Sequence, residues 1–289
     1  MLRPRWLSVA GLVLLSMDTA QAQTGLLVLA HGAGPEWNDR VRETVAQVTW
    51  PNGPVATAFL MGPEATSAGW DSAAALLVRE GAVEVVVVPL MVSSFGSHYR
   101  QIRFYAGELS EMPAELAAHD HGTNGSPPVP MRVTAALDDA PELGAVLLDR
   151  WRALDSVDRR RALMLVAHGP TTDAEAGRWV AHIQNAASGI AREGRIAVEI
   201  GLLRDDAPPP VRAAAIAKIH AQARALITGP ADSVTVMPVL ISTGRIDRVT
   251  IPKDLTGLPV RYTPMVLAPH AALARWIERV AIARLEATP

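Results

Sequence analysis

Apolar runs alternate along the chain with amphipathic stretches of helical length, in the order strand, helix, strand. The expected strands are 26–32, 55–60, 83–89 and 131–136, then 163–169, 196–203, 234–238 and 260–266, with helices near 39–48, 72–80, 174–187 and 211–226. The run 85–88 consists of valines without polar alternation, so both faces of that strand should be covered. The pattern predicts an α/β fold with two tandem doubly wound domains, each a mainly parallel four-stranded sheet flanked by helices.

An internal repeat supports two copies of one domain. The segment 26–32 reads Leu-Leu-Val-Leu-Ala-His-Gly and the segment 163–169 reads Leu-Met-Leu-Val-Ala-His-Gly. A charged stretch at 155–161 separates the copies, and the Gly- and Pro-containing stretch 120–128 is expected to be a loop inside the first. We therefore expect an N-terminal domain over 23–155 and a C-terminal domain over 161–289.

The N-terminus has the pattern of a secretory signal. Arg3 and Arg5 precede an apolar stretch at 7–17 and the small-residue sequence Ala20-Gln21-Ala22. We expect residues 1–22 to be a signal peptide cleaved near Ala22, and the mature protein to be periplasmic. An uncleaved membrane anchor is the alternative, but the apolar stretch is shorter than the roughly 20 residues that span a bilayer, and no later run approaches that length.

Composition narrows the chemistry. The chain has no cysteine, which excludes disulfides, zinc thiolate sites and iron–sulfur clusters. Its formal net charge of −2 and the lack of basic runs argue against nucleic acid as a partner. Neither the Gly-x-Gly-x-x-Gly signature nor the P-loop follows a predicted strand, so no nucleotide is expected. The expected partner is a small molecule; oligomeric state is not predicted.

Histidines occupy the strand ends where ligands bind in open parallel sheets. His31 and His168 end the two repeated strands, and the segment 90–98 carries the chain past another strand end to His98, at the opening of a helix. Each alone is compatible with a hydrogen-bonded turn histidine, but His31 and His98 together predict a site. Two neutral imidazoles suit cobalt, iron, nickel or zinc and leave coordination positions open.

These motifs resemble the class II chelatases, the CbiX- and SirB-like sirohydrochlorin cobaltochelatases and ferrochelatases. The resemblance rests on 26–32, on the valine-rich strand with its Gly-x-His turn at 85–98, and on Leu-Ala-Pro-His at 267–270, and it covers nearly the whole mature chain as two fused copies. It implies a lyase-type enzyme that inserts a divalent metal into a tetrapyrrole without ATP. Cobalt is the first-choice metal, with ferrous iron or nickel next, and His31 and His98 are implied as metal ligands and proton acceptors.

The substrate side is expected to use residues around His98 and one from the second repeat. Sirohydrochlorin carries many carboxylates, which arginines bind through paired hydrogen bonds, although the same arginines would also suit an exposed helix face. His168 either lines the same cleft or is a remnant of duplication. The expected substrate-binding residues are Arg100, Arg103, His168, Ser93, Ser94 and Gly96.

The chain departs from the family pattern at two positions in the sequence and in its expected export. No second histidine follows the strand ending at Pro238, and Met61 stands where the family has an acidic residue, with Glu64 the nearest replacement. Export is unusual for tetrapyrrole synthesis. The alternatives are therefore an exported metal- or haem-binding protein without insertion activity, and a two-lobed solute-binding protein whose histidines only hydrogen-bond.

Overall fold

The computed structural model describes residues 23–116, 126–227 and 233–287, and the predicted signal peptide lies outside them. The first half contains β1 (Gln23–Ala30), α1 (Pro35–Val45), β2 (Val55–Phe59), α2 (Trp70–Arg79), β3 (Ala82–Leu90), α3 (Ser97–Tyr105), β4 (Met131–Val133) and α4 (Pro141–Arg152). The second half contains a short 3-10 turn (Asp158–Arg160), β5 (Ala162–Ala167), α5 (Asp173–Gly194), β6 (Val198–Leu202), α6 (Pro209–Ile227), β7 (Val234–Val239), a π-helical turn (Ile246–Thr250), α7 (Ile251–Asp254), β8 (Val260–Tyr262) and α8 (Ala271–Glu286).

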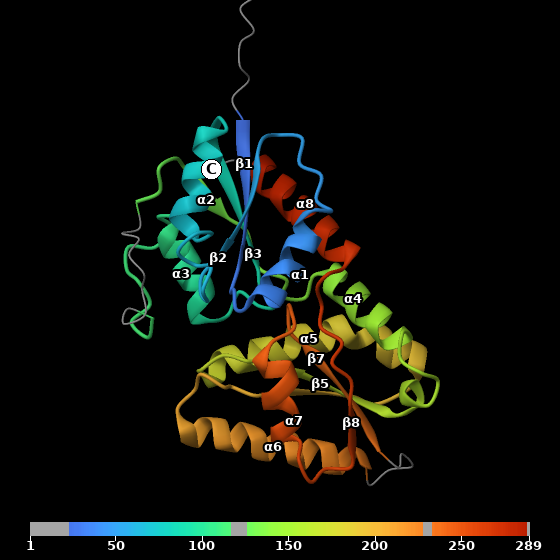
Figure 1. Cartoon of the computed structure of the whole chain (residues 1–289). Coiled ribbons are helices and arrows are strands. Elements are labelled where there is room, and N and C mark those ends of the chain that lie inside the picture. Colours follow the sequence, from blue (N-terminus) through green and yellow to red (C-terminus); the bar gives the residue numbers. More distant parts are fainter. Residues whose placement is uncertain (1–22, 117–125, 228–232, 288–289) are drawn as a thin grey trace, which may run out of the picture.

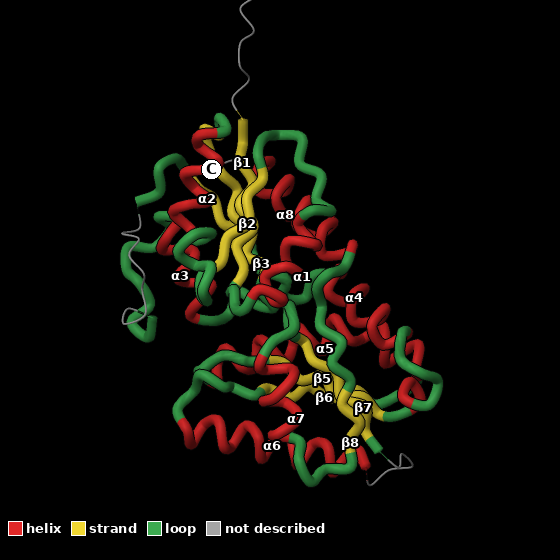
Figure 2. Tube along the Cα trace, viewed as in Figure 1, coloured by secondary structure: helices red, strands yellow, loops and turns green. Residues whose placement is uncertain are grey.

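Each half builds one four-stranded sheet, in the orders β2-β1-β3-β4 and β6-β5-β7-β8. Every strand pair is parallel. Helices cover both faces of each sheet, and the central strands β1, β3, β5 and β7 are buried almost throughout because apolar side chains point to both faces. The predicted α/β fold with two doubly wound units is confirmed (Figure 2).

The last strand of each sheet is shorter than the sequence predicts. Expected strands at 131–136 and 260–266 pair over only three residues each, at the sheet edges. Beyond them the chain still bonds to the segments that follow β3 and β7, with Leu137 N–H donating to the Met91 carbonyl at 3.1 Å and Leu267 N–H to the Leu240 carbonyl at 2.9 Å. The apolar pattern therefore indicates burial here and not strand pairing, since Leu137 and Leu267 are buried in a core that includes residues of both halves.

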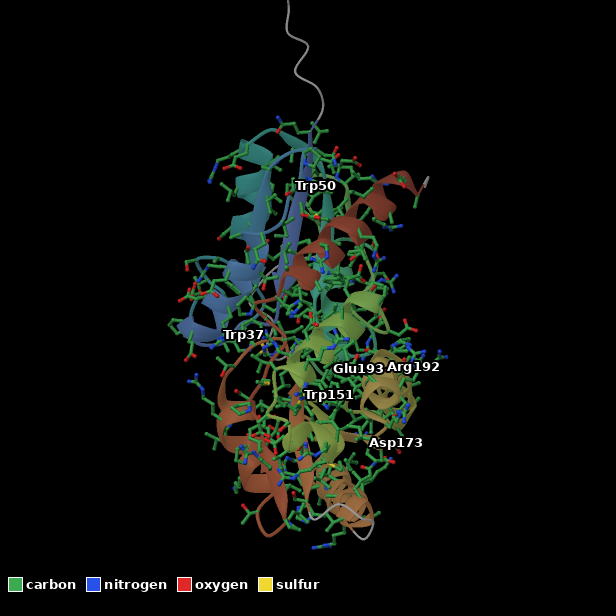
Figure 3. The ribbon with its side chains drawn as sticks, turned by 90° about the vertical axis from the view of Figure 1, so that its right-hand side faces the viewer. Trp37, Trp50, Trp151, Asp173, Arg192 and Glu193 are labelled. Carbon is green, nitrogen blue, oxygen red and sulfur yellow. The ribbon has the colours of Figure 1, made fainter. Side chains whose placement is uncertain are left out.

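The final helices are exchanged between the halves. Helix α4 packs along α5 of the second half, while α8 crosses back to pack on α1 and β3 of the first (Figure 1). Close contact between α4 and α5 depends on small residues: a Cβ at Gly144 would lie 3.0 Å from the Ala186 carbonyl oxygen, and one at Gly194 would lie 2.8 Å from the Trp151 ring. Figure 3 shows Trp151 of α4 near Glu193 of α5. One continuous apolar core therefore includes residues of both sheets. The boundary near 155–161 separates the sheets, but the helices cross it, so the domain limits stay a prediction.

Among the described residues, no helix combines the length and apolarity required to cross a bilayer.

The candidate site is positioned by the carboxyl ends of the strands. His31 follows β1, His98 lies in the first turn of α3 after the loop that leaves β3, and His168 follows β5.

Candidate metal and substrate site

His31 is fixed by a tight turn at the end of β1. The next residue, Gly32, has φ of +83°, and a Cβ there would lie 2.4 Å from the Met61 carbonyl oxygen, so only glycine fits. The His31 carbonyl accepts the Met61 N–H at 2.8 Å, which ties the turn to the end of β2. The ring Nδ1 lies 2.8 Å from the Gly32 carbonyl oxygen. Because a carbonyl only accepts, Nδ1 carries the proton and Nε2 is left with its lone pair.

His98 is oriented by its own helix. Its Nδ1 lies 3.1 Å from Oε1 of Gln101, and the Gln101 amide N–H donates in turn to the Tyr105 hydroxyl at 2.8 Å. With the amide oxygen facing the ring, Nδ1 of His98 is the donor. Nε2 of His98 therefore also presents a lone pair, the state a metal ligand requires.

The two rings meet directly. The centroids of His31 and His98 are 4.8 Å apart and their planes are nearly perpendicular, at 86°. Burial, followed by the neighbouring charge of His98, lowers the pKa of His31 from 6.5 to about 4. Burial also lowers the pKa of His98. Both imidazoles are therefore neutral at physiological pH, and protons compete weakly with a cation for their lone pairs.

The loop that delivers His98 is held by one carboxylate. Asp138 accepts hydrogen bonds from the Ser93 hydroxyl at 3.2 Å, the Ser94 N–H at 2.8 Å and the Ser94 hydroxyl at 2.7 Å. The Ser93 hydroxyl also accepts the Phe95 N–H. Ser93 and Ser94, predicted on the substrate side, use their hydroxyls within the loop in this structure. Gly96 is extended, with open space where a Cβ would stand.

The second domain clamps the same loop through α5. The indole N–H of Trp179 donates to the Phe95 carbonyl at 2.5 Å, and the guanidinium of Arg178 lies over the Phe95 ring, 5.4 Å from its centroid. His182 packs against Phe95 with ring centroids 5.6 Å apart, and its Nδ1 lies 3.4 Å from Asp138. The roles of Trp179, His182 and Asp138 are not predictable from the sequence, because helix periodicity does not show which domain a helix contacts.

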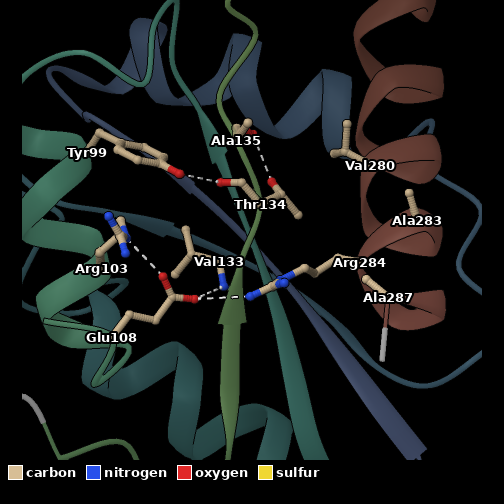
Figure 4. A pocket seen from close by; sticks show the side chains of 10 residues that line it. All are labelled: Tyr99, Arg103, Glu108, Val133, Thr134, Ala135, Val280, Ala283, Arg284 and Ala287. Atoms are coloured by element: carbon tan, nitrogen blue, oxygen red, sulfur yellow. Dashed lines mark hydrogen bonds and ion pairs between the residues drawn. The ribbon is translucent and has the colours of Figure 1, made fainter. Parts of the chain in front are cut away.

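The two predicted arginines have different surroundings. Arg100 bridges the halves by pairing with Glu175 of α5, and also with Glu115 at 2.6 Å. Arg103 pairs with Glu108 at 2.9 Å, and both line an open pocket of about 410 Å³ at the β4 edge, bordered on its other side by Val280 and Arg284 of α8 (Figure 4). None of the three histidines lines that pocket. Arg100 thus lies at the domain junction, whereas Arg103 lines a pocket that is separate from the three histidines.

The second repeat keeps one histidine and replaces the other. Val166 pairs with Pro238 as Leu29 pairs with Pro89, so the two sheets have the same register. Counting equally from those prolines, the position of His98 is taken by Asp247, which is buried and accepts from the Thr243 hydroxyl at 2.8 Å and from the Gly244 N–H. A complete pair of histidines therefore exists only in the first repeat, as the sequence predicts.

Glu64 does not serve as an acid at the histidine pair. It is held by Arg42 and by the Asn38 amide at 2.8 Å, both on α1. Within residues 23–116, 126–227 and 233–287, no three His, Asp or Glu side chains converge closely enough to hold one ion. His31 and His98 are the two histidines whose rings meet at this edge.

Sequence and structure comparisons agree on the class. The chain aligns with SirB from Bacillus subtilis subspecies spizizenii, a sirohydrochlorin chelatase solved with cobalt, at 14% identity and a TM-score of 0.56, covering 91% of this chain and 93% of that one. It aligns with CbiX, described as the terminal enzyme of siroheme biosynthesis in denitrifying bacteria, at 18% identity and a TM-score of 0.50, covering 90% and 98%.

A multi-domain protein from Deinococcus radiodurans with structural similarity to chelatases gives 14% identity and a TM-score of 0.57; the chain spans 56% of its length, and 92% of this chain is covered. No curated protein matches the sequence. At these identities the solved structures show the fold alone.

Fold and paired histidines together define a two-domain protein of the chelatase-like α/β class. The more specific assignment comes from sequence: residues 25–154 match the model of the CbiX family. The matched segment carries both His31 and His98.

Proposed function

We propose that the protein is a sirohydrochlorin-type chelatase that inserts a divalent metal into a tetrapyrrole without ATP, with His31 and His98 as the metal ligands. The observation that carries this proposal is the contact of two partly buried imidazoles whose Nε2 atoms both keep a lone pair. A metal must lose water before it enters a macrocycle, and two ligands hold it while leaving positions open for pyrrole nitrogens. The match of residues 25–154 to the CbiX family model supports the same reaction.

Cobalt is the proposed metal, with ferrous iron or nickel next. Imidazole nitrogen suits all three, so the ligand set alone does not choose among them. SirB from Bacillus subtilis has been solved with cobalt and with Fe3+, which supports cobalt and iron as the first metals to test. Arg100 is the stronger of the two predicted arginine candidates for a substrate carboxylate because it lies at the domain junction, whereas Arg103 lines a pocket that includes none of the three histidines. A substrate carboxylate bound to Arg100 would replace Glu115 or Glu175.

Export is also part of the proposal. It rests on the basic, apolar and small-residue pattern of residues 1–22. N-terminal sequencing of protein recovered from the periplasmic fraction is expected to start at Gln23, and an intact N-terminus in the cytoplasmic fraction would contradict export.

The activity is tested with purified protein, sirohydrochlorin and Co2+, following the absorbance change on metallation. The wild type is expected to exceed the uncatalysed rate, and His31→Ala and His98→Ala are expected to fall to it. His220→Gln is the matched control, because that histidine bonds to the Asp254 carbonyl in the second half, remote from the pair. Cobalt binding through His31 and His98 without acceleration would instead identify an exported metal-binding protein.

A further inference from the structure

His168 repeats the geometry of His31 in the second domain. It follows β5, the next residue Gly169 has φ of +78°, and its Nδ1 lies 3.1 Å from the Gly169 carbonyl oxygen. By the same argument as for His31, Nδ1 carries the proton and Nε2 has the lone pair. The difference is what Nε2 faces: it lies 3.6 Å from a carboxylate oxygen of Asp206.

This second pair lies beside the first, because Arg100, two residues after His98 on α3, pairs with Glu175 in the first turn of α5, the helix that follows His168. The charge of His168 lowers the pKa of both His31 and His98, and the charge of Asp206 raises both. Four groups from two domains therefore act on each other electrostatically. They do not converge on a single ion position in the described part of the chain, so His168 and Asp206 do not act as further ligands there.

Asp206 is the carboxylate available for this role. It lies in the loop after β6, where its neighbour Asp205 is paired with Arg212 at 2.7 Å and Arg204 is paired with Asp173. The side chain of Asp206 is 65% exposed, whereas that of His168 is 29% exposed, so the pair leads from the site to solvent. Glu115 also acts on His98, but Arg100 neutralises it.

The reaction needs a proton acceptor distinct from the metal ligands. When a tetrapyrrole takes up M2+, two N–H bonds break, each electron pair stays on nitrogen to bond the metal, and two protons leave. A histidine nitrogen that donates its lone pair to the metal has none left for a proton. His31 is in addition a weak base, because burial lowers its pKa to about 4.

We infer that His168 and Asp206 form the proton-accepting pair of the proposed chelatase reaction, while His31 and His98 hold the metal. Nε2 of His168 takes one pyrrole proton, and the resulting imidazolium lies against the Asp206 carboxylate, which stabilises it. The proton then passes to water at the exposed edge of the pair, and the neutral ring accepts the second. The metal is thus delivered by residues of the first domain, and the protons leave through residues of the second. This inference rests on the proposed function.

The test uses the full chain with His168→Gln, Asp206→Asn and Asp206→Glu, measuring metallation of sirohydrochlorin and, separately, Co2+ binding by calorimetry. General-base loss typically costs about 100-fold or more in rate. We expect kcat to fall about 100-fold in His168→Gln and about 10-fold in Asp206→Asn. In both, KM for sirohydrochlorin and the Kd for Co2+ should stay within about 3-fold of wild type, and Asp206→Glu should recover most of kcat because it restores a carboxylate.

Asp205→Asn is the matched control, an equal charge change one residue away on a carboxylate that faces Arg212; thermal melts confirm that each variant folds. Wild-type kcat in both His168→Gln and Asp206→Asn overturns the inference while the proposed function stands. A fall in kcat that Asp205→Asn reproduces, or one that follows loss of Co2+ binding, also overturns it. A wild type without any metallation activity overturns the proposed function itself, and the inference with it.

Discussion

The imidazoles of His31 and His98 meet edge to face, with centroids 4.8 Å apart, although one follows β1 and the other lies in the first turn of α3. Parallel pairing of β1 with β3 brings these chain segments to the same edge of the sheet. The contact is supported on one side by the turn at Gly32 and on the other by Gln101. Each support gives an expected outcome that separates metal binding from folding.

Gln101 is expected to set the affinity of His98 for metal. Gln101→Leu removes the acceptor at Nδ1, so the ring no longer holds the tautomer with a free Nε2, and Co2+ affinity should fall about 10-fold or more. Gln101→Glu keeps an acceptor and should bind at least as tightly as wild type. Calorimetric titration with Co2+ measures both, and equal affinities in the two variants would refute the role of Gln101.

Gly32→Ala is expected to destabilise the fold. At φ of +83° with the Met61 carbonyl 2.4 Å from a Cβ, the turn must open, at a cost of about 2 kcal/mol or more. Gly34→Ala is the control, because its φ is −73° and nothing lies within 4 Å of a Cβ there. Urea unfolding should show a large loss for the first and a change within about 1 kcal/mol for the second; similar losses would contradict the turn argument.

The clamp from α5 is expected to matter for metal binding although no residue of it touches the metal ligands. Trp179→Phe removes the indole N–H that holds the Phe95 carbonyl, which should loosen the loop and weaken Co2+ binding about 3- to 10-fold. Trp37→Phe makes the same change in α1 of the first domain, next to Gly244 in the loop that lacks a histidine. That control should bind Co2+ as wild type does; equal weakening in both would point to general destabilisation.

Acid is expected to destabilise the protein through His31. Its pKa is about 4 in the folded protein against 6.5 when unconstrained, so between these values the unfolded chain binds more protons. The contribution of neutral His31 to the free energy of unfolding is fully present above pH 6.5 and is lost as pH falls toward 4. This contribution is about 3 kcal/mol at most. Urea unfolding at pH 7.5 and 4.5 should show a smaller loss in His31→Gln than in wild type. The same loss in both would show that His31 titrates normally.

The pattern of apolar runs predicted the sheets and most helices because strands covered on both faces have a distinct composition. Spacing also predicted the meeting of His31 and His98, since parallel strands end at the same edge. The exchange of α4 and α8 was not predictable, because an amphipathic helix shows that it has a partner and not which one. For the same reason, the roles of Asp206 and Trp179 and the separate surroundings of Arg103 emerge only from tertiary contacts.

A structure of the protein with cobalt bound tests the central claim most directly, by locating the ion through its anomalous scattering. The account predicts one strong peak within about 2.2 Å of Nε2 of both His31 and His98, with its remaining positions open. A peak on other residues, or no ordered cobalt at these two rings in crystals soaked at neutral pH, would contradict it.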